Sequence, residues 1–158
     1  MRAAARGFTL IEVLIALVIL SIGLLGVAKL VTGAVHADDS AYMRGQATQL
    51  AYELLDMMRA NRPGAIAGYY TDPAAYANCA NVACSDQTVA ALDLYNWQNE
   101  LAVALPSGTG TVIMNTDAFN DTTATITVSW DDSQAQWAFG TASGVTPGAM
   151  SVTLESIL

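Results

Sequence analysis

The chain contains few of the residue types that carry catalytic or metal-binding chemistry. It has one histidine and two cysteines, and its 6 lysines and arginines are outnumbered by 14 aspartates and glutamates, for a net charge of −8. Nucleic-acid binding depends on a basic patch, and scattered bases do not form one. Motifs for phosphate-binding loops, dinucleotide-binding turns and EF-hand calcium loops are also absent from the sequence. We therefore predict no enzymatic activity, no direct nucleic-acid binding, no cofactor and no metal site.

Two acidic pairs could suggest cation sites, namely Asp117 with Asp121 and Asp131 with Asp132. Asparagine and aspartate are ordinary turn formers, so we interpret both pairs as turns. The single histidine, His36, is interpreted as an interfacial or solvated residue. The three tryptophans are expected in the core: Trp97, Trp130 and Trp137.

Charge is almost absent between residues 8 and 28, where Glu12 is the only ionisable side chain. As a helix this run would span about 32 Å, which matches a hydrocarbon core of about 30 Å. Arg2 and Arg6 precede it, so the positive-inside rule places the N-terminus in the cytoplasm and the rest outside. An ionised carboxylate at membrane depth is costly and usually has a partner. Glu12 therefore needs an explanation.

A secretory signal peptide is one alternative for this segment, because "AVHA" before Asp38 resembles a cleavage site. The apolar core of a signal peptide is only about 7–15 residues long, and Glu12 would lie inside it. We therefore favour a helix that is retained in the mature protein. A plain single-pass anchor would still leave Glu12 unexplained.

Proline is absent before Pro63, and the helical pattern continues beyond the membrane run. One helix is therefore predicted from residue 8 to about residue 59, with "NRPG" at residues 61–64 as its stop signal. Its second half carries an apolar stripe: Met43, Ala47, Leu50, Leu54 and Met57. Four glycines are expected to mark points of bending or local melting: Gly23, Gly26, Gly33 and Gly45.

The remaining chain predicts a loop, a second helix and several strands. Residues 63–84 are predicted to form a loop. Ser85 can cap a second helix, which Pro106 would end. The apolar stripe of this helix consists of Ala90, Leu94, Trp97, Leu101 and Ala104. Segments rich in β-branched residues predict strands at 111–116, 123–130 and 150–158, with a further short strand at 137–139. The predicted fold class is α+β, with a long N-terminal helix packed on a head that contains a second helix and an antiparallel sheet. The first half of the long helix spans the membrane, and its second half is amphipathic.

The two cysteines, Cys79 and Cys84, lie in one loop on the extracytoplasmic side of the predicted membrane segment. Such a location favours a disulfide. Zinc requires about four ligands, and the only histidine is far away in the sequence. A Cys79–Cys84 disulfide is therefore predicted rather than a metal site.

The stretch "GFTLIEVLIALVILSIGLLG", behind a short basic leader, resembles the N-terminal motif of type IV pilins and the related pseudopilins. The resemblance implies that a prepilin peptidase cuts between Gly7 and Phe8 and methylates the new amine of Phe8. It divides the chain into a leader (1–7), a transmembrane and assembly helix (8–35) and a periplasmic globular head (36–158) that includes the amphipathic half of the long helix.

The same resemblance gives Glu12 a role in assembly. In the family, this acid is associated with the N-terminal amine of a neighbouring subunit, so Glu12 would help to dock the chain into a helical bundle, with Thr9 assisting through its hydroxyl. The cost of Glu12 in lipid would then favour transfer from the inner membrane into the filament.

Within that family, the chain looks most like minor pilins of the PilV type. The likeness rests on "SIGLLGVA", "ELLDMMRANRPGA", the two-cysteine loop, "DLYNWQNELAVALPSGTGTV" and "VSWDD". It implies a minor subunit of a type IV pilus, in a tip complex that primes assembly, with roles in adhesion, twitching motility and DNA uptake through the pilus. The implied partners are the prepilin peptidase, other minor pilins, a tip adhesin and the major pilin.

Two alternatives stay open. A minor pseudopilin of a type II secretion system shares the cleavage motif and the long helix. A secreted or anchored periplasmic binding domain is the second, and it leaves "GFTLIE" unexplained. The membrane half of the helix contains no proline, whereas major pilins commonly have one there, which also favours a minor subunit.

Overall fold

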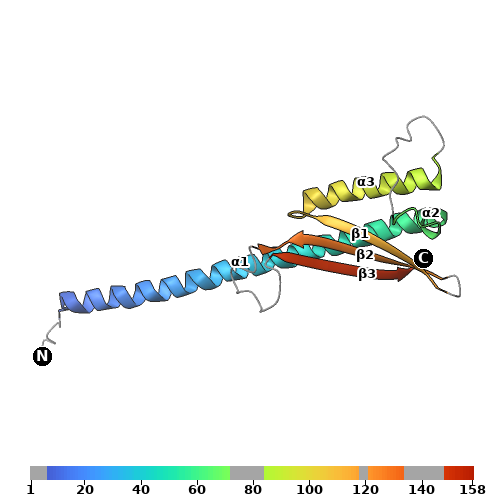
Figure 1. Cartoon of the computed structure of the whole chain (residues 1–158). Coiled ribbons are helices and arrows are strands. Elements are labelled where there is room, and N and C mark those ends of the chain that lie inside the picture. Colours follow the sequence, from blue (N-terminus) through green and yellow to red (C-terminus); the bar gives the residue numbers. More distant parts are fainter. Residues whose placement is uncertain (1–6, 72–83, 118–120, 134–147) are drawn as a thin grey trace, which may run out of the picture.

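The computed structural model describes residues 7–71, 84–117, 121–133 and 148–158. Three helices precede three strands: α1 (Leu10–Ala60), α2 (Arg62–Ile66), α3 (Asp86–Ala104), β1 (Thr109–Thr116), β2 (Thr122–Asp131) and β3 (Ala149–Ile157). The first half of α1 projects away from the rest of the protein, and α3 and the sheet pack against its second half (Figure 1). This is the pilin-like α+β fold predicted from the sequence.

Helix α1 is continuous over 51 residues, as the absence of proline predicts. It passes through all four glycines without a break, so the expected local melting is not seen. A glycine raises the free energy of helix formation by only about 1 kcal/mol relative to alanine. The neighbouring residues favour the helix enough to offset this cost. The predicted bending points are therefore ordinary helical positions in this structure.

The second half of α1 supplies much of the core of the head. Its buried residues are Ala47, Leu50, Ala51, Leu54, Leu55 and Met58. Most of the predicted stripe is confirmed, but Met43 and Met57 are only half-buried and Met58 is fully buried. The core is thus centred slightly to one side of the predicted stripe.

The predicted end of α1 at the "NRPG" segment is confirmed, but the loop assignment that followed it is wrong at its start. Residues Arg62–Ile66 form the short helix α2, with Asn61 between the two helices at φ −108° and ψ 51°. Proline is tolerated in the first turn of a helix because its missing N–H would have no partner there. Pro63 therefore stops α1 and starts α2.

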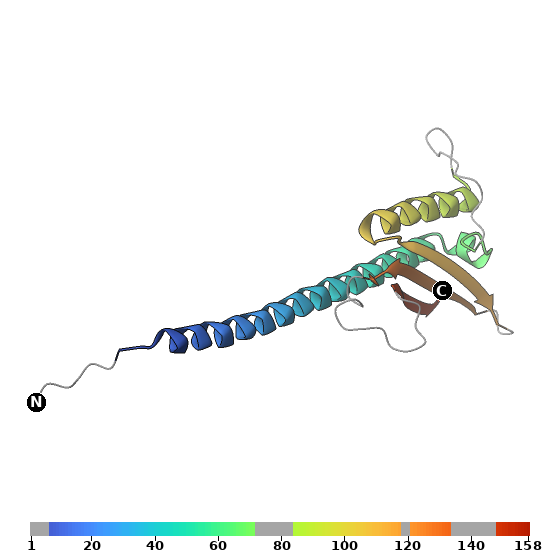
Figure 2. The same cartoon turned by 60° about the vertical axis from the view of Figure 1, so that its left-hand side comes forward.

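Helix α3 begins where Ser85 was expected to cap it, and the Ser85 hydroxyl accepts a hydrogen bond from the Thr88 N–H at 3.2 Å. Its buried face carries Ala90, Ala91, Leu94, Trp97 and Leu101, whereas Ala104 at its end is exposed. The helix lies beside the second half of α1 in both views (Figures 1 and 2).

The sheet is antiparallel with the order β1-β2-β3. Compared with the prediction, β1 begins two residues earlier, β2 is one residue longer at each end, and β3 is shifted by one residue toward the N-terminus. Ile126 of β2 pairs with Val112 of β1 and with Leu154 of β3. The inner face of β2 is buried through Ala124, Ile126, Val128 and Trp130. The predicted strand at 137–139 and Trp137 lie outside the described residues, while Trp97 and Trp130 are confirmed in the core.

Polar contacts attach the sheet to α1 and α2 near both ends of the sheet. At one end the Ser40 hydroxyl donates to the carboxylate of Asp132, just after β2. At the other end Arg59 donates to the Ser156 hydroxyl at 3.2 Å, and Arg62 donates to the carbonyl oxygen of Leu158 at 3.1 Å. The sheet is therefore fastened over a stretch that runs from residue 40 to residue 62.

Candidate functional site

The segment before α1 is extended and open. Gly7, Phe8 and Thr9 lie outside the helix, and Phe8 is 84% exposed. A Cβ atom built on Gly7 would meet no other atom within 4 Å. The fold therefore gives no steric reason for a glycine at position 7.

Helix α1 begins with a hydrogen-bonded cap that the sequence analysis did not anticipate. The Thr9 hydroxyl accepts a hydrogen bond from the Glu12 N–H at 3.4 Å, and the Thr9 carbonyl accepts one from the same N–H at 3.2 Å. A threonine followed three residues later by glutamate is the spacing of a capping box. The sequence signal was present in "TLIE", but it was read only as part of the family motif.

Glu12 lies in the first turn of α1 and is exposed. A negative charge there is favoured by the partial positive charge at the helix N-terminus, an effect of about 0.3–1 kcal/mol at exposed sites. This corrects the view that a plain anchor would have no use for Glu12. The local benefit is nevertheless smaller than the cost of the charge in a membrane interior, which is about 2.5–3.5 kcal/mol.

Among the described residues, α1 is the one helix whose length and composition would allow it to cross a membrane. No residue in its apolar window is buried within the chain. Its side chains include Leu24 and Leu30, which are 61% and 75% exposed. Such a surface is stable only against lipid or against other apolar helices.

Residues 2–28 match the family model described as the prokaryotic N-terminal methylation motif. The motif marks a type IV pilin-like or pseudopilin-like protein. It implies processing by a prepilin peptidase, and it identifies a structural protein rather than an enzyme. The apolar first half of α1 is consistent with a prepilin held in the inner membrane before assembly. Neither the curated proteins nor the solved structures contain a significant match to this chain.

The disulfide prediction is not tested by the structure. Cys84 directly precedes the cap of α3, whereas Cys79 lies outside the described residues. Pairing of the two cysteines therefore stays a prediction.

The acidic pairs differ from each other. Asp117 is confirmed as part of a turn, since its carboxylate accepts from the Asp121 N–H at 2.9 Å. Asp131 ends β2, and its carboxylate accepts from the Ser133 N–H at 2.9 Å. Asp132, by contrast, is only 3% exposed and bonds Ser40 on α1. The turn interpretation is thus wrong for Asp132, which joins two elements distant in the sequence.

His36 was interpreted as an interfacial or solvated residue, and the structure tests only the second of these. Its side chain is half-buried, and its Nδ1 atom is buried without a hydrogen-bond partner among the described residues, as is Nε1 of Trp130. His36 is therefore not a fully solvated residue. No group of three or more histidine, cysteine, aspartate or glutamate side chains within the described ranges could hold a metal ion.

A buried polar network, not predicted from the sequence, joins the ends of the helices. Asn61 donates through Nδ2 to the carbonyl oxygen of Asp86 at 2.8 Å and to the Tyr70 hydroxyl at 3.4 Å. Tyr70 in turn donates to the carboxylate of Asp93 at 2.6 Å. Burial, followed by the hydrogen bond to Asp93, raises the pKa of Tyr70 well above its usual range. The network fixes the segment after α1 against α3.

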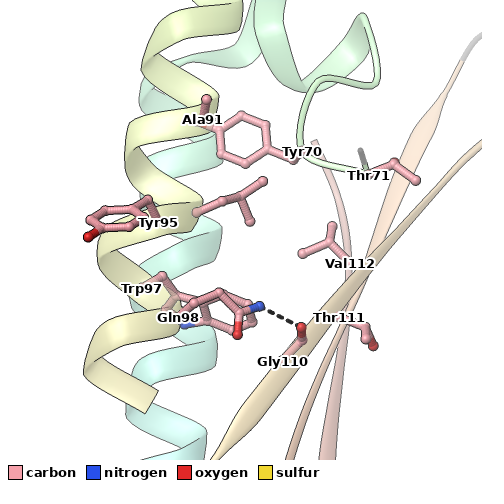
Figure 3. A pocket seen from close by; sticks show the side chains of 10 residues that line it. Tyr70, Thr71, Ala91, Tyr95, Trp97, Gln98, Gly110, Thr111 and Val112 are labelled. Carbon is pink, nitrogen blue, oxygen red and sulfur yellow. Dashed lines mark hydrogen bonds between the residues drawn. The ribbon is translucent and has the colours of Figure 1, made fainter. Parts of the chain in front are cut away.

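Next to Tyr70, α3 and β1 line a partly open cavity of about 580 Å³ (Figure 3). Tyr70, Trp97 and Val112 are among the side chains that line it. Two of its polar side chains are bonded within the fold, since Gln98 donates to the carbonyl oxygen of Gly110 at 2.7 Å and Tyr70 donates to Asp93. The surface of the cavity is mostly apolar.

Proposed function

We propose that the chain is a minor pilin of a type IV pilus, part of a tip complex that primes filament assembly. The observation that carries the proposal is the single carboxylate of Glu12 in the first turn of an exposed apolar helix, within the matched methylation motif. An assembly in which many such helices pack together would bury this apolar surface and give the carboxylate a partner. Adhesion, twitching motility and DNA uptake would then depend on the pilus as a whole.

The proposed maturation step is cleavage between Gly7 and Phe8, with methylation of the new Phe8 amine. The extended, exposed segment around these residues supports the proposal, because a peptidase needs access to the backbone. The leader (1–7) would be removed, the helix at 8–35 would stay in the inner membrane, and the head (36–158) would lie in the periplasm. After assembly the chain would be part of the pilus at the cell surface.

The proposed role of Glu12 is to form an ion pair with the positively charged Phe8 amine, either in the same subunit or in a neighbouring one. Thr9 supports this role by capping the helix, which holds the Glu12 residue in the first turn next to the new N-terminus. An ion pair in an apolar environment is much stronger than one in water. Transfer from lipid into a packed bundle would thus stabilise both charges.

The likeness to PilV-type minor pilins gains support from the places where the shared segments fall. "NRPG" contains the buried Asn61, which bonds α3, and Gly64, whose Cβ would clash with the Asn61 side chain. "PSGTG" contains Gly110, whose Cβ would clash with the Trp97 ring. Each segment therefore contains a residue that contacts another element of the head closely.

The processing step is tested by the mass of the N-terminal peptide of the mature protein. The expected peptide begins at Phe8 and carries one methyl group. Gly7→Leu should leave the precursor uncleaved, and because a side chain at position 7 touches nothing in the fold, misfolding would not account for that result. A mature protein that begins at Asp38 would show a secretory signal peptide instead.

The role of Glu12 is tested by Glu12→Ala, assayed by copurification with other minor pilins and by counting surface pili. Membrane insertion and cleavage should remain, while incorporation should fall. Ser21→Ala is the matched control, because Ser21 also places a polar side chain in the apolar half but bonds the Val18 carbonyl of its own helix at 2.8 Å. Wild-type incorporation of the Glu12→Ala chain would rule out the assembly role.

The remaining alternative is a minor pseudopilin of a type II secretion system, which the motif equally allows. Deletion of the gene in its own host separates the two. Loss of pili with normal protein secretion supports the pilus, and the reverse result supports the secretion system. The Cys79–Cys84 disulfide is proposed for either case.

A further inference from the structure

A shallow groove of about 430 Å³ lies where the C-terminal end of α3 meets α1. Six residues line it: Leu50, Glu53, Asn99, Glu100, Val103 and Ala104. Val103 is 89% exposed, more than any other large hydrophobic side chain in the described part of the chain. The surface of the groove is therefore mostly apolar, and the groove is open to a partner.

The rim of this groove is negatively charged from three sources. Glu53 of α1 and Glu100 of α3 both line it, and neither carboxylate has a hydrogen-bond or ion-pair partner among the described residues. The last turn of α3 contains no basic residue, so the partial negative charge at the end of the helix is not compensated there. A cationic group would be favoured in this position.

The chain cannot supply that cation itself from the bases whose positions are described. Arg59 pairs with Asp56 at 3.3 Å, and Arg62 bonds the Leu158 carbonyl. Arg44 precedes Glu53 by nine residues on the same helix, which at about 100° per residue places it on the opposite side of α1. Lys29 lies about 30 Å further along the helix from Leu50. A cation that binds between Glu53 and Glu100 would therefore come from another molecule.

We propose that the groove receives a helix of a neighbouring pilin-like subunit, with a lysine or arginine between Glu53 and Glu100 and an apolar side chain against Val103. The proposal rests on the proposed function, because it takes assembly with other such subunits as given. It adds the residues of the head that recognise the neighbour. The head would thereby select partners by charge and not only by the apolar surface of α1.

A helix is the fitting occupant because the groove lies at the end of α3 that faces the membrane half of α1 (Figures 1 and 2). In both views the C-terminal end of α3 points toward that half (Figures 1 and 2). A second helix that packs along the apolar half of α1 would thus meet the end of α3 as it passes into the head. Packed helices approach to about 8–10 Å, which allows contact with both Glu53 and Val103.

The test is site-specific photocrosslinking in the full-length chain, expressed in its own host with its native subunits. A benzophenone amino acid at Val103 should give a covalent product with another pilin-like subunit, and peptide mass spectrometry should place the linkage in a helix beside a lysine or arginine. The same probe at Ile113, on the outer face of the sheet and 54% exposed, should not give this product.

Charge recognition is tested by adding Glu53→Gln and Glu100→Gln to the Val103 probe. Each change should lower the yield of the crosslinked product about two- to fivefold, as expected for loss of an exposed ion pair. Glu155→Gln, an identical change on the outer face of the sheet, should leave the yield unchanged. When the partner's lysine or arginine is replaced by glutamate and Glu53 is replaced by lysine in this chain, the yield of the crosslinked product should return to its original level.

The outcomes separate this inference from the proposed function. A probe at Leu24 in the membrane half should crosslink pilin-like subunits if the chain assembles with them at all. Products from Leu24 but none from Val103 would overturn the groove and leave the proposed function standing. Products from neither position would overturn both. Crosslinks from Val103 to lipid or to unrelated proteins only, or a yield unaffected by both glutamine changes, would also overturn the groove.

Discussion

The indole Nε1 of Trp97 on α3 donates a hydrogen bond to the carbonyl oxygen of Leu50 in the middle of α1, with an N···O distance of 2.9 Å. A carbonyl oxygen has two lone pairs, so Leu50 can accept this bond in addition to a bond within its own helix. The Trp97 ring is completely buried and also contacts the start of β1 at Gly110. One side chain thus fixes α1, α3 and the sheet relative to each other.

Trp97→Phe is expected to destabilise the head by about 1–3 kcal/mol. The change removes the donor to Leu50 and leaves unfilled volume at the junction of three elements. Thermal unfolding of the full chain in detergent, followed by circular dichroism, measures the effect. Tyr52→Phe is the control, since Tyr52 lies on the outer side of α1 and is 52% exposed. Equal midpoints for both variants would contradict the role given to Trp97.

Two glycine substitutions should act in opposite directions. Gly110→Ala should destabilise by about 1–3 kcal/mol, because the new methyl group would clash with the Trp97 ring and overpack the core. Gly45→Ala should stabilise by up to about 1 kcal/mol, because Gly45 lies inside α1 and its Cβ would meet no atom within 4 Å. The unfolding midpoints of the two variants check this directly, and a lower midpoint for Gly45→Ala would show a contact at that position.

Tyr70 should make the stability of the head sensitive to alkaline pH. Its pKa is raised by burial and by the Asp93 carboxylate, whereas in the unfolded chain the phenol ionises near pH 10, as the value of about 10 for free tyrosine implies. The stabilisation is therefore complete below about pH 10 and is lost as the pH rises above it, by at most about 1.4 kcal/mol per pH unit. Tyr70→Phe should remove this part of the pH dependence, measured by unfolding between pH 8 and 11. Parallel curves for the two proteins would contradict it.

The Cys79–Cys84 disulfide should be present in protein isolated from the periplasm or from pili. Thiol labelling with and without reductant, followed by peptide mass spectrometry, detects it. Closure of a ring of this size is expected to contribute about 2–3 kcal/mol. A Cys79→Ser, Cys84→Ser double variant should unfold at a lower temperature than wild type under oxidising conditions and like wild type in reductant. Two free thiols in the native protein would refute the bond.

The sequence predicted those elements that local chemistry determines. The absence of proline and a regular apolar stripe were sufficient to predict α1, and Ser85 was sufficient to predict the start of α3. Helix α2 was missed because Pro63 was read as a stop signal, while its other property, compatibility with a first helical turn, was not considered. Even so, every strand in the described part of the chain was predicted to within a few residues, because β-branched runs are local signals as well.

Contacts between distant segments could not be predicted in this way. Asp132 looks like a turn residue until the fold brings it against Ser40, which is 92 positions earlier. Tyr70 acquires its role from Asn61, which lies between α1 and α2, and from Asp93 on α3. For Glu12 the missed contact is a local one. The family motif accounts for this residue, but the hydrogen bond of its N–H with the Thr9 side chain was not predicted.

The attachment of the sheet at both ends has a mechanical consequence. A pull on the head, directed along α1, would tend to slide the sheet lengthwise over the helix. Such sliding must break the contact between Ser40 and Asp132 at one end together with those of Arg59 and Arg62 at the other. Since these bonds are loaded in parallel and not one after another, the head can transmit tension to the long helix without yielding first at either edge.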